Sequence, residues 1–497
     1  TKQNPTTMDT MDPNTTAAIV CVALTGIGLW VVQQQSKQNT NKSVPDALGG
    51  SPMIGNALQY KENPTGCIRE EEKQSKIFRL NLAGRRMVIV GSDPDVMKQV
   101  ANQPESVLSS CRAVAELGFE HTLGHFNVYS GTAWHKSILK NAIMGENFAT
   151  TFLPGIYKAM DAATETELKN LPNAEGKQSG PDLFDFVRRC VLRATLDEFV
   201  SPLLLQKDPD LLTALMVFQD QVEDATARAA VLPRFLALPA CLWPTEKARK
   251  SIEARVCRLL PTILKSDNSN WGPWTKEYAK EKTTPELAAE HLIGLIFAAH
   301  KNPSIGAAQC FCFLRSELSS ELQSKAGEEA KRLCQQFTSN SSSLTEALLQ
   351  AQILRKCVLE TMRVTAHTLG AVRYVNQNLE VKTRDRSYQI AKGETVSLAH
   401  HTMHMEPSLW GKDAETFSLD RPEWNENGNK ESIGIPVDHY KMVTFSHGTH
   451  KCPGEKIALA MMQIQVALLL VGDTQLVGDL PPVSFERATL AQRDGPV

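Results

Sequence analysis

The segment from Phe445 to Gly454, FSHGTHKCPG, constrains this chain more than any other, because it places one cysteine directly before a long apolar run. Glycines at positions 448 and 454 let backbone N–H groups approach the cysteine sulfur closely. The run Glu455–Val471 predicts a helix whose positive N-terminal end faces Cys452. Such surroundings stabilise a thiolate, which is the form of cysteine that binds metals. We therefore predict that Cys452 is a metal ligand rather than an inert buried thiol.

Composition excludes several other classes of protein. The chain has 11 cysteines without a CxxC pair, which argues against a structural zinc site and a disulfide framework and favours reduced thiols. Its 53 basic and 55 acidic side chains are well mixed and give a net charge of −2, so nothing indicates a nucleic-acid partner.

The N-terminal region predicts a membrane anchor. Residues 16–32, TAAIVCVALTGIGLWVV, form an uncharged apolar run at the short end of the range for a membrane-spanning helix. Acidic residues precede this run and Lys37 and Lys42 follow it, which predicts a single-pass anchor with the rest of the chain in the cytosol. We expect a tail at 1–15, the anchor at 16–32, a polar linker rich in proline and glycine at 33–55, and one catalytic domain at 56–497.

The body of the chain is predicted to be mainly α with small β-sheets. Ile77–Leu82 and Met87–Val90 flank a short turn and predict a hairpin. From about residue 130 to 360, apolar residues recur at helical spacing. Strand patterns return at Ala371–Val375, Leu379–Lys382 and Thr395–Leu398.

The cysteine loop resembles the haem-binding loop of cytochromes P-450. Glu360-Thr361-Met362-Arg363 matches the family's ExxR motif, and Phe417–Arg421 resembles the segment whose arginine joins that pair. The resemblance implies a cytochrome P-450 fold and a haem b whose iron has the Cys452 thiolate as its axial ligand. It also implies that Glu360, Arg363 and Arg421 hold the fold together without reacting.

The same resemblance suggests further contacts to the haem. Within the loop these are Phe445, Gly448, Gly454 and His450, the last as a partner of a haem propionate. Arg373 stands where relatives place an arginine that binds a propionate. Trp134 matches the tryptophan of the early WxxxR motif, but Ile138 replaces the arginine of that motif.

Thr284-Pro285-Glu286 begins a long apolar helix that, by resemblance, crosses the distal face of the haem. Relatives carry an acid and an alcohol there, whereas this chain has Lys301 and Asn302, preceded by His300 and followed by Pro303. Asn302 can donate a hydrogen bond but cannot readily relay a proton. All three of His300, Lys301 and Asn302 are candidate catalytic residues. The alternatives are that the Lys301 side chain points away from the haem into solvent or an ion pair, and that His300 is an ordinary interior histidine.

Residues 357–470 are most similar to the group of sterol 7α- and 12α-hydroxylases and prostacyclin synthase. This group contains both oxidising and rearranging enzymes, and the missing acid and alcohol favour a rearranging one. Because most relatives with a haem-thiolate site are monooxygenases, we expect a monooxygenase of the endoplasmic reticulum membrane. Such an enzyme takes electrons from NADPH-cytochrome P-450 reductase and oxidises a hydrophobic sterol, terpenoid or other lipid-like substrate with O2. The first alternative is an isomerase or dehydratase that rearranges a peroxide-containing substrate without a reductase, and the second is a haem-binding sensor or inactive carrier. By resemblance, Thr365–Gly370 with His367 line the cavity above the haem, and Ala113–Phe126 form its roof.

Overall fold

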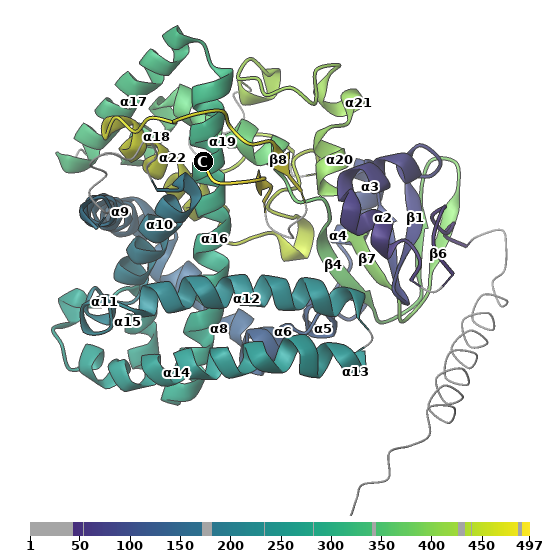
Figure 1. Ribbon diagram of the computed structural model, residues 1–497, viewed down its shortest axis with the longest axis horizontal. Helices are drawn as coiled ribbons and strands as arrows, with labels where there is room; N and C mark the ends of the chain where they lie inside the picture. Colours follow the sequence, from purple (N-terminus) through teal and green to yellow (C-terminus); the bar gives the residue numbers. More distant parts are fainter. Residues whose placement is uncertain are drawn as a thin grey trace, which may run out of the picture.

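The computed structural model describes residues 43–497 except 53, 171–180, 233, 282, 340–343, 426–432, 439 and 486–489. The expected tail, the expected anchor at 16–32 and the first part of the linker therefore lie outside the described residues. Within the described part of the chain, no helix has the length and apolar character needed to cross a bilayer. The described residues form a large helical region with a smaller β-region on one side (Figure 1). This architecture confirms the prediction of a mainly α fold with small sheets.

The largest sheet joins strands that are far apart in the sequence. Its order is β1 (Ile77–Leu82), β2 (Arg85–Val90), β7 (Thr395–Leu398), β4 (Gly370–Val375) and β3 (Leu108–Ser109). β1 and β2 form the predicted hairpin, and β2 then pairs in parallel with β7. The hairpin turn at Ala83-Gly84 has φ values of 52° and 89°, which suit the twist of a two-residue hairpin loop. Two smaller ladders are β5 (Leu379–Lys382) with β6 (Ser387–Ile390) and β8 (Val483–Ser484) with β9 (Gln492–Arg493).

The longest helix, α16 (Pro285–Glu317), runs through the helical region and organises it (Figure 1). Its start agrees with the prediction, because the Thr284 side chain accepts a hydrogen bond from the N–H of Leu287. It packs against α10 (Leu183–Phe199), α14 (Trp243–Leu264), α19 (Gln352–Val364) and α22 (Glu455–Val471). The other long helices are α9 (Leu153–Lys169), α12 (Leu211–Val231) and α17 (Ser320–Thr338).

Helices α22 and α12 occupy different places in the helical region. α22 is apolar on almost every face, as expected for a fully buried helix, and packs against α9, α16, α17 and α19. α12 lies alongside α14 at one edge of the helical region (Figure 1). The shorter helices are α2 (Ala57–Glu62), α3 (Pro64–Glu72), α4 (Pro94–Ala101), α5 (Ser110–Glu116), α6 (Phe119–Thr122), α7 (His125–Tyr129), α8 (Gly131–Ile138), α11 (Leu203–Lys207), α13 (Arg234–Ala237), α15 (Pro273–Lys280), α18 (Leu344–Gln350), α20 (His400–His404) and α21 (Pro407–Trp410).

Candidate active site

A cavity of about 580 Å³ lies among α16, the cysteine loop, α8 and β4, and Cys452 is part of its lining. Its size is in the usual range for sites that bind cofactors and small molecules. Of the segment Thr365–Gly370, His367 and Gly370 line the cavity as expected. The expected roof segment Ala113–Phe126 contributes no lining residue. Instead, Phe119 of that segment packs against Phe297 of α16, with 6.2 Å between the ring centroids.

The cysteine loop is a tight backbone reversal. The N–H of Cys452 donates a hydrogen bond to the carbonyl of Phe445 at 2.8 Å, which closes the loop. Gly448 has a left-handed φ of 64°. A Cβ atom at that position would lie 2.4 Å from the carbonyl oxygen of Ala101 at the end of α4. Glycine is therefore required here because the loop packs closely on α4, and not because it approaches the sulfur as the sequence suggested.

The sulfur of Cys452 sits at the start of α22. The N–H of Gly454 and the charge of Lys451 favour the thiolate, yet burial is the largest influence and raises the pKa of Cys452. A Cβ atom at Gly454 would be 3.9 Å from the sulfur, an ordinary contact, so the sulfur alone does not demand glycine there. A buried thiolate at this place needs a strong positive charge beside it, which a bound metal ion supplies.

A basic group lines one part of the cavity. Lys136, Arg373 and His450 belong to it. Neither Lys136 nor Arg373 forms an ion pair with any side chain that the structure describes, and Arg373 donates only to the carbonyl of Val372, at 2.9 Å. His450 lies 3.4 Å from the carboxylate of Glu105. Burial lowers the pKa of His450, and the charges of Arg373 and Lys136 lower it further.

His400 also lines the cavity and has no partner for its ring. The residue is 3% exposed, and neither ring nitrogen has a hydrogen-bond partner among the described residues. Gly370 makes room for this ring, because a Cβ atom there would lie 2.2 Å from it. The His400 ring, Lys136 and Arg373 are therefore available to an anionic group that accepts hydrogen bonds. The carboxylates of a haem b have this chemistry, so the residues present fit the cofactor that the sequence predicts.

Trp134 is not among the residues that line the cavity. Its ring stacks on His291, with 4.0 Å between centroids, and its indole N–H is buried without a hydrogen-bond partner among the described residues. Ile138, in the place of the motif's arginine, is fully buried in the core. The structure brings Lys136 to the cavity instead, a residue that sequence reasoning missed. The sequence feature that could have indicated Lys136 is its position two residues after Trp134.

On α16, only one of the three candidate catalytic residues lines the cavity. That residue is Asn302, whose side-chain oxygen accepts a hydrogen bond from the N–H of Leu490 at 3.3 Å. Because a backbone N–H can only donate, the oxygen of the amide must face Leu490. The NH2 group of Asn302 has no partner among the described residues and remains available as a donor.

Lys301 and His300 point elsewhere. Lys301 is 3% exposed, and its Nζ lies 3.0 Å from Asp220 and 2.6 Å from Glu223, both on α12. His300 Nδ1 lies 3.0 Å from the side-chain nitrogen of Gln219, also on α12. Neither of these two candidate residues lines the cavity. Their side chains connect α16 to α12, which matches the alternative interpretations of an ion pair and an interior histidine.

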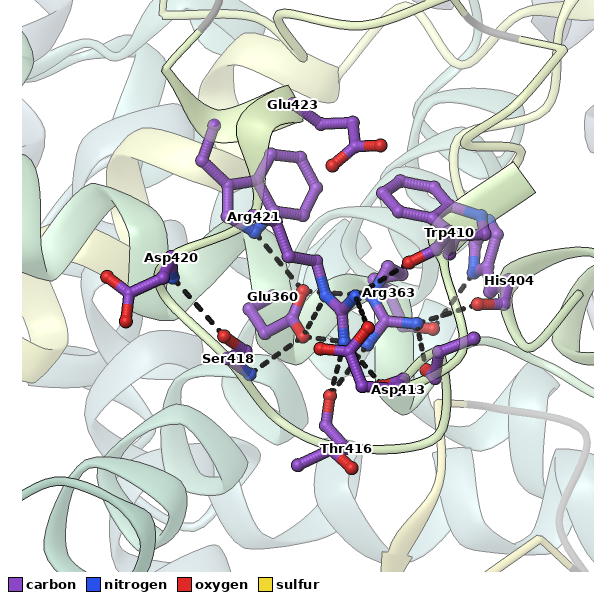
Figure 2. A network of polar contacts seen from close by, with 12 residues as sticks. Glu360, Arg363, His404, Trp410, Asp413, Thr416, Ser418, Asp420, Arg421 and Glu423 are labelled. Atoms are coloured by element: carbon purple, nitrogen blue, oxygen red, sulfur yellow. Dashed lines mark hydrogen bonds and ion pairs between the residues drawn. The ribbon is translucent and has the colours of Figure 1, made fainter. Parts of the chain in front are cut away.

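The three charged residues of the ExxR group meet in the core, as Figure 2 shows. Arg363 donates to both oxygens of Glu360 at 2.8 and 2.7 Å, and Arg421 donates to the same carboxylate at 2.8 Å. The two guanidinium groups also donate to backbone carbonyls of Trp410 and Thr416 and of their neighbours. The network therefore fixes the segment between α21 and Arg421 to α19. Its three charged residues do not line the cavity.

Comparison with known proteins agrees with these observations. The profile of the family described as Cytochrome P450 matches residues 45–471. The chain is 23% identical to cytochrome P450 3A13 of Mus musculus over 448 residues, 84% of this chain and 83% of that protein. It is 24% identical to 25-hydroxycholesterol 7-alpha-hydroxylase of Rattus norvegicus over 332 residues, 62% of this chain and 74% of that protein. It is 26% identical to cytochrome P450 7A1 of Sus scrofa over 494 residues, 93% of each. The predicted resemblance to sterol hydroxylases is thus confirmed.

Proposed function

This chain belongs to the cytochrome P450 family of monooxygenases, and we propose that it is a membrane-bound member that oxidises a hydrophobic, lipid-like substrate. The observation that carries the proposal is that Cys452 and Asn302 line one cavity, together with apolar side chains. Cys452 provides the ligand to iron, and Asn302 provides the one polar side chain that α16 contributes to the lining.

The residues that would hold the haem are Cys452 at the iron and Lys136, Arg373, His400 and His450 at the carboxylates. When bound, haem with a thiolate ligand supplies the activation of O2. The electrons for this chemistry come from NADPH by way of NADPH-cytochrome P-450 reductase in our proposal.

The chain's own contribution on α16 is a hydrogen-bond donor and an open backbone carbonyl. Asn302 offers its NH2 group toward the cavity, and an amide donates without ionising. Pro303 has no N–H, so the carbonyl of Ala299 loses its helical partner and can hold a water molecule. We propose that a water molecule at this carbonyl, oriented by Asn302, passes on protons that it takes up from solvent water, the role that an acid and an alcohol have in relatives. The apolar lining residues Leu295 and Ala298 exclude other water and favour an apolar substrate.

We infer that the substrate is a sterol, a terpenoid or another lipid-like metabolite. The apolar part of the cavity lining supports this class, and one relative is named for an oxysterol that it hydroxylates.

We propose that the protein is anchored in the endoplasmic reticulum membrane with its catalytic domain in the cytosol. The apolar run at 16–32 supports a spanning segment. Phe235, Leu236 and Trp243, in α13 and at the start of α14, are 74%, 46% and 55% exposed and offer a second apolar contact to a lipid surface.

A specific observation keeps an isomerase or dehydratase as the second candidate. None of the α16 residues that line the cavity is ionisable, and the lysine at the acid's position is held in ion pairs with α12. A reaction that rearranges an existing O–O bond needs no proton delivery to dioxygen, so such a helix suits it.

The deciding experiment compares two assays of the membrane-bound protein. The first contains NADPH, P-450 reductase, O2 and a panel of sterols and terpenoids, and the second contains a lipid hydroperoxide or endoperoxide and no reductant. Product that requires NADPH, reductase and O2 is the expected result. Product formed only from the peroxide without reductant would overturn the monooxygenase proposal in favour of the isomerase.

A further inference from the structure

His367 is an imidazole that the haem-binding group does not use. It lies in the turn between α19 and β4 and lines the cavity. Its Nδ1 atom is buried without a hydrogen-bond partner among the described residues, and its side chain forms no other hydrogen bond there. Burial lowers the pKa of His367 to about 4, so the ring is neutral at neutral pH.

The surroundings of His367 differ from those of its neighbour His400. The pKa of His400 is lowered first by burial and then by other histidines and the charge of Arg373, which places it beside the basic group. The pKa of His367 is lowered by burial alone, without a contribution from any charged side chain. The two ring centroids are 6.4 Å apart. The charge of Arg373 therefore acts on the His400 ring and not on the His367 ring, although both rings line the same cavity.

The position of His367 is fixed by the backbone. Its carbonyl accepts a hydrogen bond from the N–H of His401 at 3.0 Å. The turn follows directly after α19, whose Glu360 and Arg363 are locked in the buried charge network (Figure 2). A ring on a backbone held in this way stays at the cavity wall, where it can select a ligand that carries a matching group.

A neutral imidazole carries one donor and one acceptor, and leaving them unpaired in an apolar cavity costs free energy. An uncharged hydroxyl or carbonyl oxygen on a ligand satisfies one of them. A charged ligand group is disfavoured at this place, because it would have to be desolvated without a countercharge.

We propose that His367 determines substrate specificity by forming a hydrogen bond with a single hydroxyl or carbonyl oxygen of an otherwise apolar, uncharged substrate. This inference rests on the proposed function, since it names the substrate class of the same cavity.

The test measures ligand binding by the change in the haem absorption spectrum, without reductase or NADPH. A protein that proved to be an isomerase would still give a result, so the failure of this inference and that of the monooxygenase proposal can be told apart. The probes are pairs with one carbon skeleton that differ by an oxygen atom: cholesterol with cholestene, hexadecanol with hexadecane, and menthol with menthane. The variants are His367→Leu, His367→Asn and the control His401→Leu. His401 is a neighbouring buried imidazole that does not line the cavity.

For at least one pair, the wild type is expected to bind the oxygenated member about tenfold more tightly, as one additional hydrogen bond implies. His367→Leu should abolish this preference, His367→Asn should restore part of it, and His401→Leu should leave it unchanged. The proposal is overturned if no oxygenated probe binds, if both members of every pair bind equally, or if His367→Leu keeps the preference. It is also overturned if His367→Leu loses haem rather than selectivity, because His367 would then serve the cofactor.

Discussion

At the scale of single residues, Asn302 combines a fixed orientation with an unused donor. The N–H of Leu490 holds its side-chain oxygen, so the NH2 group must point elsewhere. A preorganised donor beside a site of developing negative charge is worth a large factor in rate, because no reorganisation is needed when the charge appears.

Asn302→Ala is expected to lower kcat by about a hundredfold, the usual effect of removing one preorganised donor. Haem content and the affinity for substrate should change little, because Asn302 contributes to neither the iron ligand nor the basic group. Product formation with NADPH and reductase is the measurement, and Ser110→Ala, at another lining residue, is the control. An unchanged kcat would contradict the donor role.

Several residue roles could be predicted from the sequence, and others could not. The place of Cys452 before a long apolar helix is a local pattern, and the structure shows the predicted helix start. The reason for Gly448 was not predictable, because the atom that excludes a side chain belongs to Ala101, far away in the sequence. His400 and Lys136 were missed for the same reason, since only the folded chain brings them to the cavity.

At the scale of elements, one buried lysine makes the ion pairs that connect α16 with α12. Lys301 meets Asp220 and Glu223, about eighty positions earlier in the sequence, and Asp220 also pairs with Arg188 at 2.9 Å. The start of α16 could be predicted from Thr284 and Pro285 because a helix cap is local. The partner of Lys301 could not, because no sequence pattern indicates which helix packs beside another.

Lys301→Met is expected to destabilise the protein by about 3 kcal/mol, because it leaves the largely buried Glu223 without its partner. The double variant Lys301→Met with Glu223→Gln should recover part of this loss by removing the unpaired charge. Thermal unfolding measures both effects.

Lys325→Met is the matched control for that experiment, because Lys325 pairs with Glu321 on an exposed face of α17 and such pairs contribute little. Equal Tm values for Lys301→Met and Lys325→Met would contradict the account of the buried contact.

At the scale of the whole molecule, buried neutral histidines make stability depend on pH. Burial lowers the pKa of His300, His401 and His404 to about 3 in each case, from an ordinary value of 6.5. The unfolded chain binds protons at these rings below pH 6.5, whereas the folded chain does not until about pH 3. Stability is therefore complete above the unfolded value and is lost as the pH falls below it.

We expect the Tm to be nearly constant from about pH 8 to about pH 7 and to fall below about pH 6.5. These three rings alone lower the free energy of unfolding by up to about 4 kcal/mol per pH unit. His401→Leu should reduce this slope by about 1.4 kcal/mol per pH unit, because one titrating ring is removed. Thermal unfolding across this range is the measurement, and a Tm that stays level down to about pH 5 would contradict the prediction.

The central claim for the molecule is that Cys452 is the thiolate ligand of a haem. The most direct test is the absorption spectrum of the reduced protein with carbon monoxide, compared for the wild type, Cys452→Ala and the control Cys67→Ala, whose half-buried thiol lies on α3 outside the cavity. The account predicts the red-shifted band of thiolate-ligated haem in the wild type and in Cys67→Ala, and its loss in Cys452→Ala. Survival of that band in Cys452→Ala would contradict the account.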